Sequence, residues 1–163
     1  MEFTFMKNFK NIKNIKNIKN IFAISAIAVS AIFSNNFAFA ANADDVEITD
    51  EFVRLNAPNA KATGAFMNIK NKTNAEIKII SAENTVSQKT ELHTHMDENG
   101  VKKMRQIPEI IIPANGSVVL KPGDLHIMLI GLNQPLQENQ KVDIKINFAD
   151  GSTKIISPLV IKK

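Results

Sequence analysis

Short runs of alternating apolar and polar residues fill the chain after residue 45, and they constrain its fold more than any other feature. Residues that favour turns separate these runs, as at Asn99-Gly100, Pro122-Gly123 and Asp150-Gly151. The runs are VEITDEFVRL (46–55), GAFMNIKN (64–71), AEIKIISAEN (75–84), SVVLK (117–121), DIKINF (143–148) and TKIISPLVI (153–161). Many short strands with regular turns predict an all-β sandwich or barrel of about seven to nine strands.

The first forty residues have a different composition. A Lys-, Asn- and Ile-rich run precedes thirteen uncharged residues, Ile21 to Phe33, and the segment ends in Ala38-Phe39-Ala40. This order is typical of a secretory signal peptide. The apolar part falls short of the about 20 residues that span a membrane. We therefore expect a Sec-type signal peptide over residues 1–40, with an alternative cleavage after 43, and one β domain over 41–163 in the periplasm. No stable membrane insertion is expected after cleavage.

Charge and cysteine content exclude several functions. Five of the twenty Lys and Arg residues and one of the sixteen Asp and Glu residues precede residue 41, so fifteen of each remain in the β domain. A domain without net charge gives no electrostatic reason to bind nucleic acid or an anionic membrane. The chain has no cysteine. Disulfides, thiolate metal sites and a lipid anchor after the cleavage site are therefore excluded.

Soft metal donors are concentrated in one part of the β domain. Six of its seven His and Met residues lie between positions 93 and 128, the exception being Met67, for which we expect a core position. Side chains alternate along a strand, so His126 and Met128 in GDLHIMLIGL share one face while Ile127 and Leu129 share the other. One face is then purely aliphatic, and the opposite face presents two donors.

The segment ELHTHMDENGVKKM predicts a hairpin around Asn99-Gly100. A two-residue type I′ turn places His95 opposite Met104, whereas a four-residue loop places His93 there. In both registers these three side chains share a face, whereas a three-residue loop would break that arrangement. Cross-strand neighbours lie about 4.5–5.5 Å apart at Cβ, close enough for two of them to reach one ion.

Imidazoles together with thioethers form a soft, uncharged ligand set, which favours Cu(I) over hard cations. Zinc is a weaker candidate because its usual ligands are Cys, His and carboxylate. A blue-copper centre is excluded because it requires cysteine. Cu(II), which prefers nitrogen and oxygen, remains an alternative cargo. A thiolate-free site also releases its ion more readily than a thiolate cage, which suits delivery.

The spacing of these donors resembles a known family signature. His93, Met104, His126 and Met128 follow the pattern H-x10-M-x21-H-x-M of the periplasmic copper chaperones called PCu(A)C. The surrounding segments TELHTHMDENGVKKMRQI, IPANGSVVLKPGDLHIMLIGL and VRLNAPNAKATGAFMNIKNKT are also similar to the family. The resemblance covers about residues 46–160. One departure is Phe52, where many members of the family carry Trp.

The resemblance implies a cupredoxin-like Greek-key β-sandwich or barrel that binds copper and is not an enzyme. It implies Cu(I) held by His93, Met104, His126 and Met128. His95 and Met96 depart from the family pattern and are potential auxiliary donors next to His93. It also implies delivery to the copper-site subunit of a respiratory haem–copper oxidase, alongside a Sco-type protein, by a monomer. The alternative is an exported β-sandwich that binds a protein partner and has no metal role.

Overall fold

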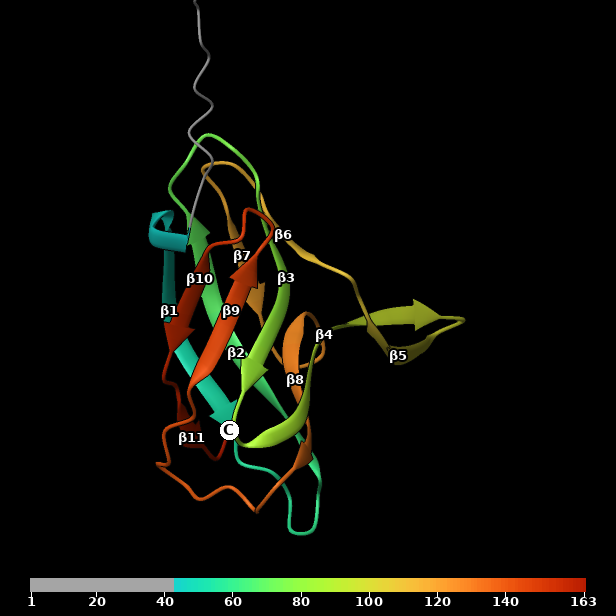
Figure 1. Cartoon of the computed structure of the whole chain (residues 1–163). Helices are drawn as coiled ribbons and strands as arrows, with labels where there is room; N and C mark the ends of the chain where they lie inside the picture. Colours follow the sequence, from blue (N-terminus) through green and yellow to red (C-terminus); the bar gives the residue numbers. More distant parts are fainter. Residues whose placement is uncertain (1–42) are drawn as a thin grey trace, which may run out of the picture. The chain divides into compact units, whose positions relative to one another are not determined.

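A computed structural model describes residues 43–163, and the expected signal peptide lies outside this range. The described residues form two β-sheets that pack face to face, preceded by a short 3₁₀ turn, η2 (Figure 1). The elements are η2 (Ala43–Asp45), β1 (Val46–Arg54), β2 (Ala62–Asn71), β3 (Ile77–Asn84), β4 (Ser87–Glu98), β5 (Val101–Gln106), β6 (Ile110–Ile112), β7 (Ser117–Leu120), β8 (His126–Leu132), β9 (Ile144–Phe148), β10 (Thr153–Ile156) and β11 (Leu159–Ile161). No helix within residues 43–163 is long and apolar enough to cross a membrane.

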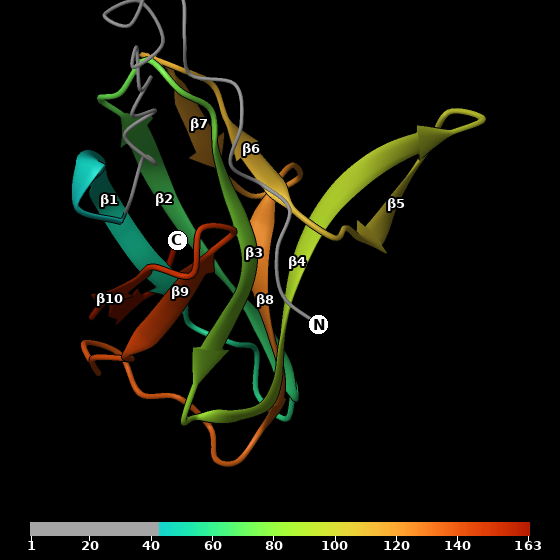
Figure 2. The same ribbon diagram turned by 45° about the horizontal axis from the view of Figure 1, so that its top comes forward.

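The larger sheet has seven strands and the smaller sheet has four. In the larger sheet the order is β11-β1-β2-β8-β4-β5, and β7 pairs with the second half of β2, residues 67–70. In the smaller sheet the order is β10-β9-β3-β6 (Figure 2). Neighbouring strands pair antiparallel except β1 and β11, which are parallel. Strands that follow each other in the chain, such as β2 and β3, often belong to different sheets. The two packed sheets confirm the expected all-β sandwich.

Apolar side chains from both sheets fill the space between them. The larger sheet contributes Ile69, Ile127 and Leu129, and the smaller sheet contributes Ile79 and other side chains that are equally buried. Burial of each such side chain stabilises the fold by about 1.5–3 kcal/mol. The smaller sheet's other contributors are Ile112, Ile144, Ile146 and Phe148. One face of every central strand is therefore committed to the core, and function must use the outer faces or the loops.

The strand number exceeds the sequence-based expectation, for two local reasons. Pro158 interrupts the run TKIISPLVI, so that its first half becomes β10 in the smaller sheet and its second half becomes β11 in the larger. Proline lacks the N–H that a continuous ladder would need. The short strand β6 also pairs with β3, although its run of three isoleucines shows no alternation. The expected seven to nine strands are thus too few.

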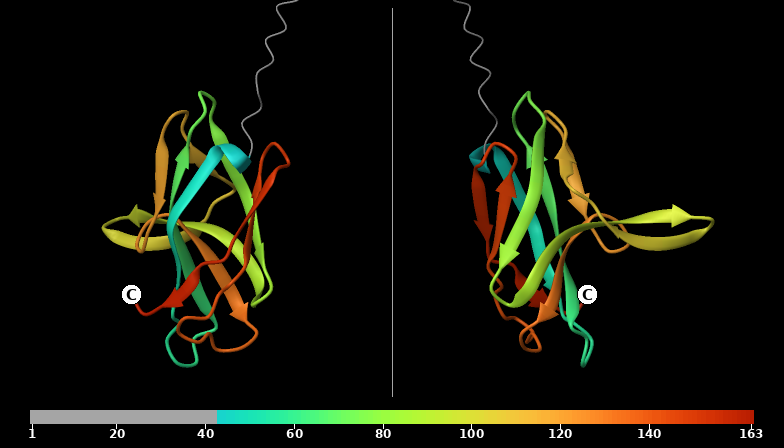
Figure 3. Two further views of the ribbon diagram at one scale, coloured as in Figure 1. Left: turned by 90° about the vertical axis from the view of Figure 1, so that its left-hand side faces the viewer. Right: turned by 45° about the vertical axis from the view of Figure 1, so that its right-hand side comes forward.

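The hairpin of β4 and β5 projects away from the sandwich (Figure 3). Every residue of β5 is exposed, and β5 pairs with β4 alone. The first half of β4, in contrast, packs into the larger sheet beside β8. β4 therefore connects the rigid sandwich to an exposed arm, and residues near its middle lie where the two meet.

Asn99 and Gly100 form the two-residue turn at the tip of this arm. Both have positive φ, at 57° and 79°, and Glu98 pairs with Val101 across the turn. These values are those of a type I′ turn. The structure thus selects the first of the two expected registers, with His95 opposite Met104.

We expect Gly100→Ala to loosen the arm without unfolding the sandwich. An added Cβ at Gly100 meets no atom within 4 Å, so the cost is the left-handed backbone of an L-residue, about 1–2 kcal/mol. Hydrogen exchange should show amide protection falling about tenfold in the arm, which comprises β5 and residues 94–98 of β4, with the first half of β4, β8 and β9 unchanged. Asn99→Gly, which keeps the turn type, is the control. Equal protection in Gly100→Ala and the wild type would contradict this assignment of the turn.

Candidate metal centre

Strand β8 divides its side chains between the core and the outer face of the larger sheet. Ile127 and Leu129 are fully buried between the sheets. His126 and Met128 point to the opposite side, because successive residues of a strand alternate. His126 is only 3% exposed even there. The expected division of this strand into an aliphatic face and a donor face is confirmed.

The neighbouring strand β4 aligns its own polar side chains with this donor face. His93 pairs directly with His126, and Glu91 pairs with Met128. The ring centroids of His93 and His126 are 5.7 Å apart. Because paired residues point to the same side of a sheet, the two imidazoles, the carboxylate and the thioether share one surface.

The projecting arm adds two further donors. His95 and Met104 face each other across the hairpin, and the ring of His95 lies 5.5 Å from that of His126. Met104 is 40% exposed. The arm therefore holds a thioether at the rim of the surface and an imidazole nearer to the sandwich.

These side chains border a groove of about 380 Å³ on the outer face of the larger sheet. Its donors are His95, Met104, His126 and Met128, brought together from three strands. The other lining residues are Arg54, Leu55, Asn56, Ala57, Ala60, Ala62, Thr63, Gly64, Phe66, Pro122 and Gly123. His93 is not among them. Its side chain, 12% exposed, lies beside His126.

His126 is held in a defined orientation by the turn that precedes β8. Gly123 has a φ of 83°, and the turn closes with a hydrogen bond from the Lys121 N–H to the Leu125 carbonyl. The Nδ1–H of His126 donates to the Asp124 carbonyl at 2.8 Å. A carbonyl only accepts, so the neutral ring has its free lone pair on Nε2. His126 can thus offer Nε2 to an ion.

The pKa of His126 is lowered, chiefly because the ring is buried and loses hydration of its charged form. The hydrogen bond to Asp124 partly opposes this shift, whereas the positive charges of His93, His95 and Arg54 add to it. His126 is therefore neutral at pH 7, as a metal ligand must be.

His93 is oriented by a carboxylate. Its Nε2 lies 2.7 Å from the Oε2 of Glu91, which is 9% exposed and also pairs with Lys89. The Nδ1 atom of His93 is buried and has no hydrogen-bond partner within residues 43–163. The second histidine of the pair thus also has one ring nitrogen engaged and one nitrogen free.

Arg54 carries the only formal charge among the described residues that line the groove. Its guanidinium carbon lies 5.4 Å from the centre of the Phe66 ring. Phe66 in turn contacts Phe52 at 5.1 Å and His126 at 5.9 Å. Phe52, which stands where many members of the similar family carry Trp, is thus part of a cluster of aromatic rings next to His126.

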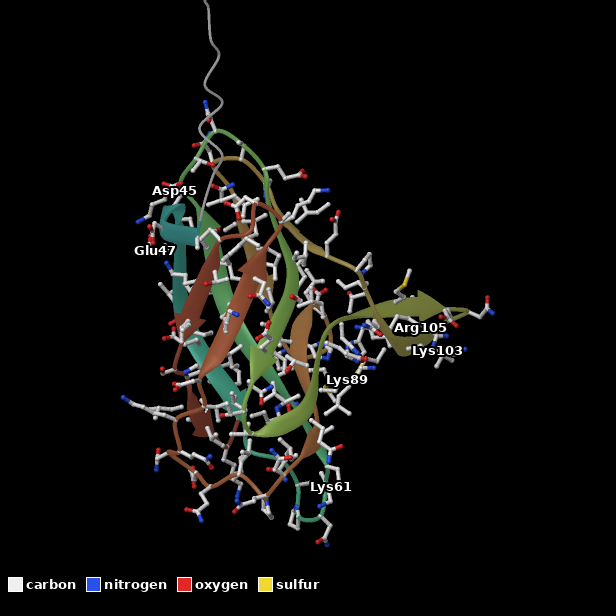
Figure 4. All side chains as sticks on the ribbon, viewed as in Figure 1. Asp45, Glu47, Lys61, Lys89, Lys103 and Arg105 are labelled. Atoms are coloured by element: carbon white, nitrogen blue, oxygen red, sulfur yellow. The ribbon has the colours of Figure 1, made fainter. Side chains whose placement is uncertain are left out.

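Two other methionines lie away from the groove. Met96 is on the opposite face of the hairpin, where it pairs with Lys103 and is 53% exposed. Lys103 and Arg105, labelled on the arm in Figure 4, both form ion pairs with Glu98 on that same face. Met67 is 2% exposed and belongs to the core, as expected. Within residues 43–163, no three His, Asp or Glu side chains form a group that could hold a metal ion.

The sequence-based reasoning did not identify three side-chain or backbone groups that shape this surface. Glu91 could have been found, because it lies two residues before His93 and so shares its face. Arg54 and the Asp124 carbonyl carry no such signal. Arg54 reaches the groove from the end of β1, and the Asp124 carbonyl contacts His126 from the turn before β8.

Comparisons with known proteins agree with this fold. A profile of the family described as "Putative lipoprotein LpqE-like" matches residues 46–158. A relative from Leifsonia xyli subsp. xyli (strain CTCB07), named "Putative lipoprotein Lxx21020", is 32% identical over 116 residues, covering 71% of this chain and 69% of the relative. The chain belongs to the LpqE-like family.

Solved structures of copper-related domains share the β-sandwich. The solution structure of Cu(I)-loaded DR1885 from Deinococcus radiodurans is 29% identical, with a TM-score of 0.59, and the match covers 72% of this chain and 77% of that one. The copper-bound PCuAC domain from PmoF2 has a TM-score of 0.62 at 13% identity, covering 73% and 94% of the two chains. The resemblance to PCuAC domains seen in the sequence is thus confirmed at the level of the fold.

Proposed function

We propose that this protein is an exported copper chaperone that binds one Cu(I) ion through His93, Met104, His126 and Met128. The observation that carries the proposal is the convergence of Met104 from the projecting arm with His126 and Met128 from β8 on one groove. His93 lies beside His126 in direct cross-strand register. Residues separated by more than twenty positions in the sequence thus supply two sulfurs and two nitrogens to one surface.

The chemistry of the groove favours a monovalent soft ion. Thioether and imidazole donors are neutral and match the softness of Cu(I). Arg54 adds a positive charge to the same surface. A nearby positive charge opposes a divalent ion more than a monovalent one, because Coulomb repulsion scales with the charge of the ion. Cu(I) is therefore the proposed cargo, in preference to Cu(II).

The position of the donors suits transfer of the ion to another protein. Met104 is exposed on an arm that projects from the sandwich, while His126 is buried against it. A partner can then approach the ion from the side of Met104. We propose the copper-site subunit of a respiratory haem–copper oxidase as the recipient, with a Sco-type protein acting alongside it. The chaperone itself is a monomeric carrier and catalyses no reaction.

The proposal is tested by anaerobic titration with Cu(I) in competition with a coloured chelator. We expect one tightly bound equivalent, and X-ray absorption of the loaded protein should count about two sulfur and two nitrogen neighbours. The loaded protein should then pass copper to a purified oxidase copper-site domain. If the protein instead binds the oxidase domain equally well with and without copper, the result would favour a protein-interaction module without a metal role.

Export is supported by the N-terminal sequence and by the lipoprotein names of the family and of the Leifsonia relative. Bacterial lipid anchors are attached to cysteine, and this sequence contains none. We therefore propose cleavage after residue 40 or 43 and residence in the periplasm without a lipid anchor. N-terminal sequencing and intact mass of the protein recovered from the periplasm test this proposal.

Copper affinity should fall as the pH is lowered, because protons compete for the imidazole nitrogens. Since the pKa of His126 lies below its usual value, proton competition at this ring begins below about pH 6.5. Affinity should therefore change little between pH 8 and pH 7 and decline towards pH 5, where the thioethers retain some binding. Chelator competition, corrected for protonation of the chelator, measures this profile. A flat profile down to pH 5 would contradict imidazole ligation.

A further inference from the structure

A buried carboxylate lies next to the paired histidines His93 and His126. Glu91 is on β4, two residues before His93 and directly opposite Met128, so it faces the same side of the sheet. It is 9% exposed, and it is bonded to two groups, the Lys89 ammonium and the Nε2 of His93. Figure 4 shows Lys89 beside β4, where that strand lies against the sandwich.

The hydrogen bond between Glu91 and His93 determines which ring nitrogen is free. A glutamate side chain is ionised at neutral pH, and the carboxylate of Glu91 is held between the Lys89 ammonium and the His93 ring. An ionised carboxylate only accepts hydrogen bonds. Nε2 of His93 must therefore carry the proton, and the lone pair of the neutral ring resides on Nδ1.

Nδ1 of His93 is one of two buried side-chain atoms within residues 43–163 that make no hydrogen bond, the other being Nε of Arg54. A buried polar atom without a partner costs about 1–3 kcal/mol, so its presence needs a reason. His126 shows the complementary arrangement, because its Nδ1 is bonded to the Asp124 carbonyl and its Nε2 is free.

We propose that Glu91 is a positioning residue of the copper site, which holds His93 in the Nε2–H form so that Nδ1 binds the ion. The two histidines then bind copper through different ring nitrogens, His93 through Nδ1 and His126 through Nε2. The negative charge of Glu91 also makes the His93 ring a stronger donor, as carboxylates hydrogen-bonded to metal-ligating histidines do. Lys89 fixes the carboxylate from its other side. This inference rests on the proposed copper-binding function.

The first test needs no copper. In the apo protein, nitrogen-15 NMR at neutral pH should show His93 protonated at Nε2 and unprotonated at Nδ1. Glu91→Ala should remove this preference, because the ring loses the acceptor that fixes it. A wild-type ring protonated at Nδ1 would overturn the inference, whatever the protein binds.

The second test measures Cu(I) affinity by anaerobic chelator competition. Glu91→Ala should weaken binding about 10- to 100-fold, as removal of such a carboxylate does elsewhere. Glu91→Gln keeps an oxygen that accepts from Nε2–H and loses only the charge, so it should recover most of that affinity. The matched control is Glu98→Gln, a glutamate on the opposite face of the hairpin that is likewise paired with cations. It should bind like the wild type.

The outcomes separate this inference from the proposed function. Circular dichroism confirms that each variant is folded before titration. Tight binding by the wild type and equally tight binding by Glu91→Ala would overturn the role of Glu91 while leaving the chaperone function in place. Absence of Cu(I) binding in the wild type would overturn the proposed function and, with it, this inference. A purely structural role would alter unfolding without altering the His93 ring nitrogens.

Discussion

The double variant His126→Ala/Met128→Ala should lose Cu(I) affinity by at least about a hundredfold, or about 2.8 kcal/mol. It removes both donors that β8 directs to the outer face. Loss of two direct ligands must exceed the about 10- to 100-fold cost of losing a single carboxylate behind a ligand. Met128→Ala alone should already weaken binding strongly. Anaerobic competition with a Cu(I) chelator measures all three proteins.

The control for this prediction is Met96→Ala. Met96 is an equally long thioether on the same hairpin, but it lies on the face away from the groove. Its removal should change the affinity less than about threefold, or about 0.7 kcal/mol. A double variant that binds Cu(I) as tightly as the wild type would end the copper-chaperone proposal. A large loss in Met96→Ala would instead mean that the hairpin turns over when the ion binds.

The fold could be predicted well where the alternation of residues was clear. Strands β1, β2, β3 and β9 lie within or around the runs read from the sequence, because one buried face fixes their register. The prediction failed where tertiary pairing replaces local pattern. β6 forms by pairing with the edge of β3, and β11 forms by pairing in parallel with the edge of β1. The local sequence pattern does not indicate either of these pairings.

The candidate site could be predicted to the level of faces. The alternation of side chains predicted that His126 and Met128 share a face, as they do in the structure. The turn residues predicted two pairing registers for the β4–β5 hairpin, and the structure has the one with His95 opposite Met104. The state of each ring nitrogen could not be predicted. It depends on the Asp124 carbonyl and on the Glu91 carboxylate, whose positions follow from a turn and a neighbouring strand.

The two histidines of β4 should differ in their importance for copper. His93 has a carboxylate behind it and a buried free nitrogen beside His126. His95 lines the groove, but its hydrogen bond, between Nδ1 and the Asp124 carbonyl, is long at 3.5 Å. We expect His93→Ala to lower Cu(I) affinity by about a hundredfold and His95→Ala by less than about tenfold, a difference of more than about 1.4 kcal/mol.

Each variant is the matched control of the other, because both remove an imidazole from the same face of the same strand. X-ray absorption then assigns the cause: the His93→Ala complex should lose one nitrogen neighbour, whereas the His95→Ala complex should keep the wild-type set. The reverse ranking would reassign the ligand to His95, the imidazole that already borders the groove with Met104. Equal losses of affinity in the two variants would mean that both rings bind copper. A third nitrogen would then replace one sulfur or add a fifth ligand.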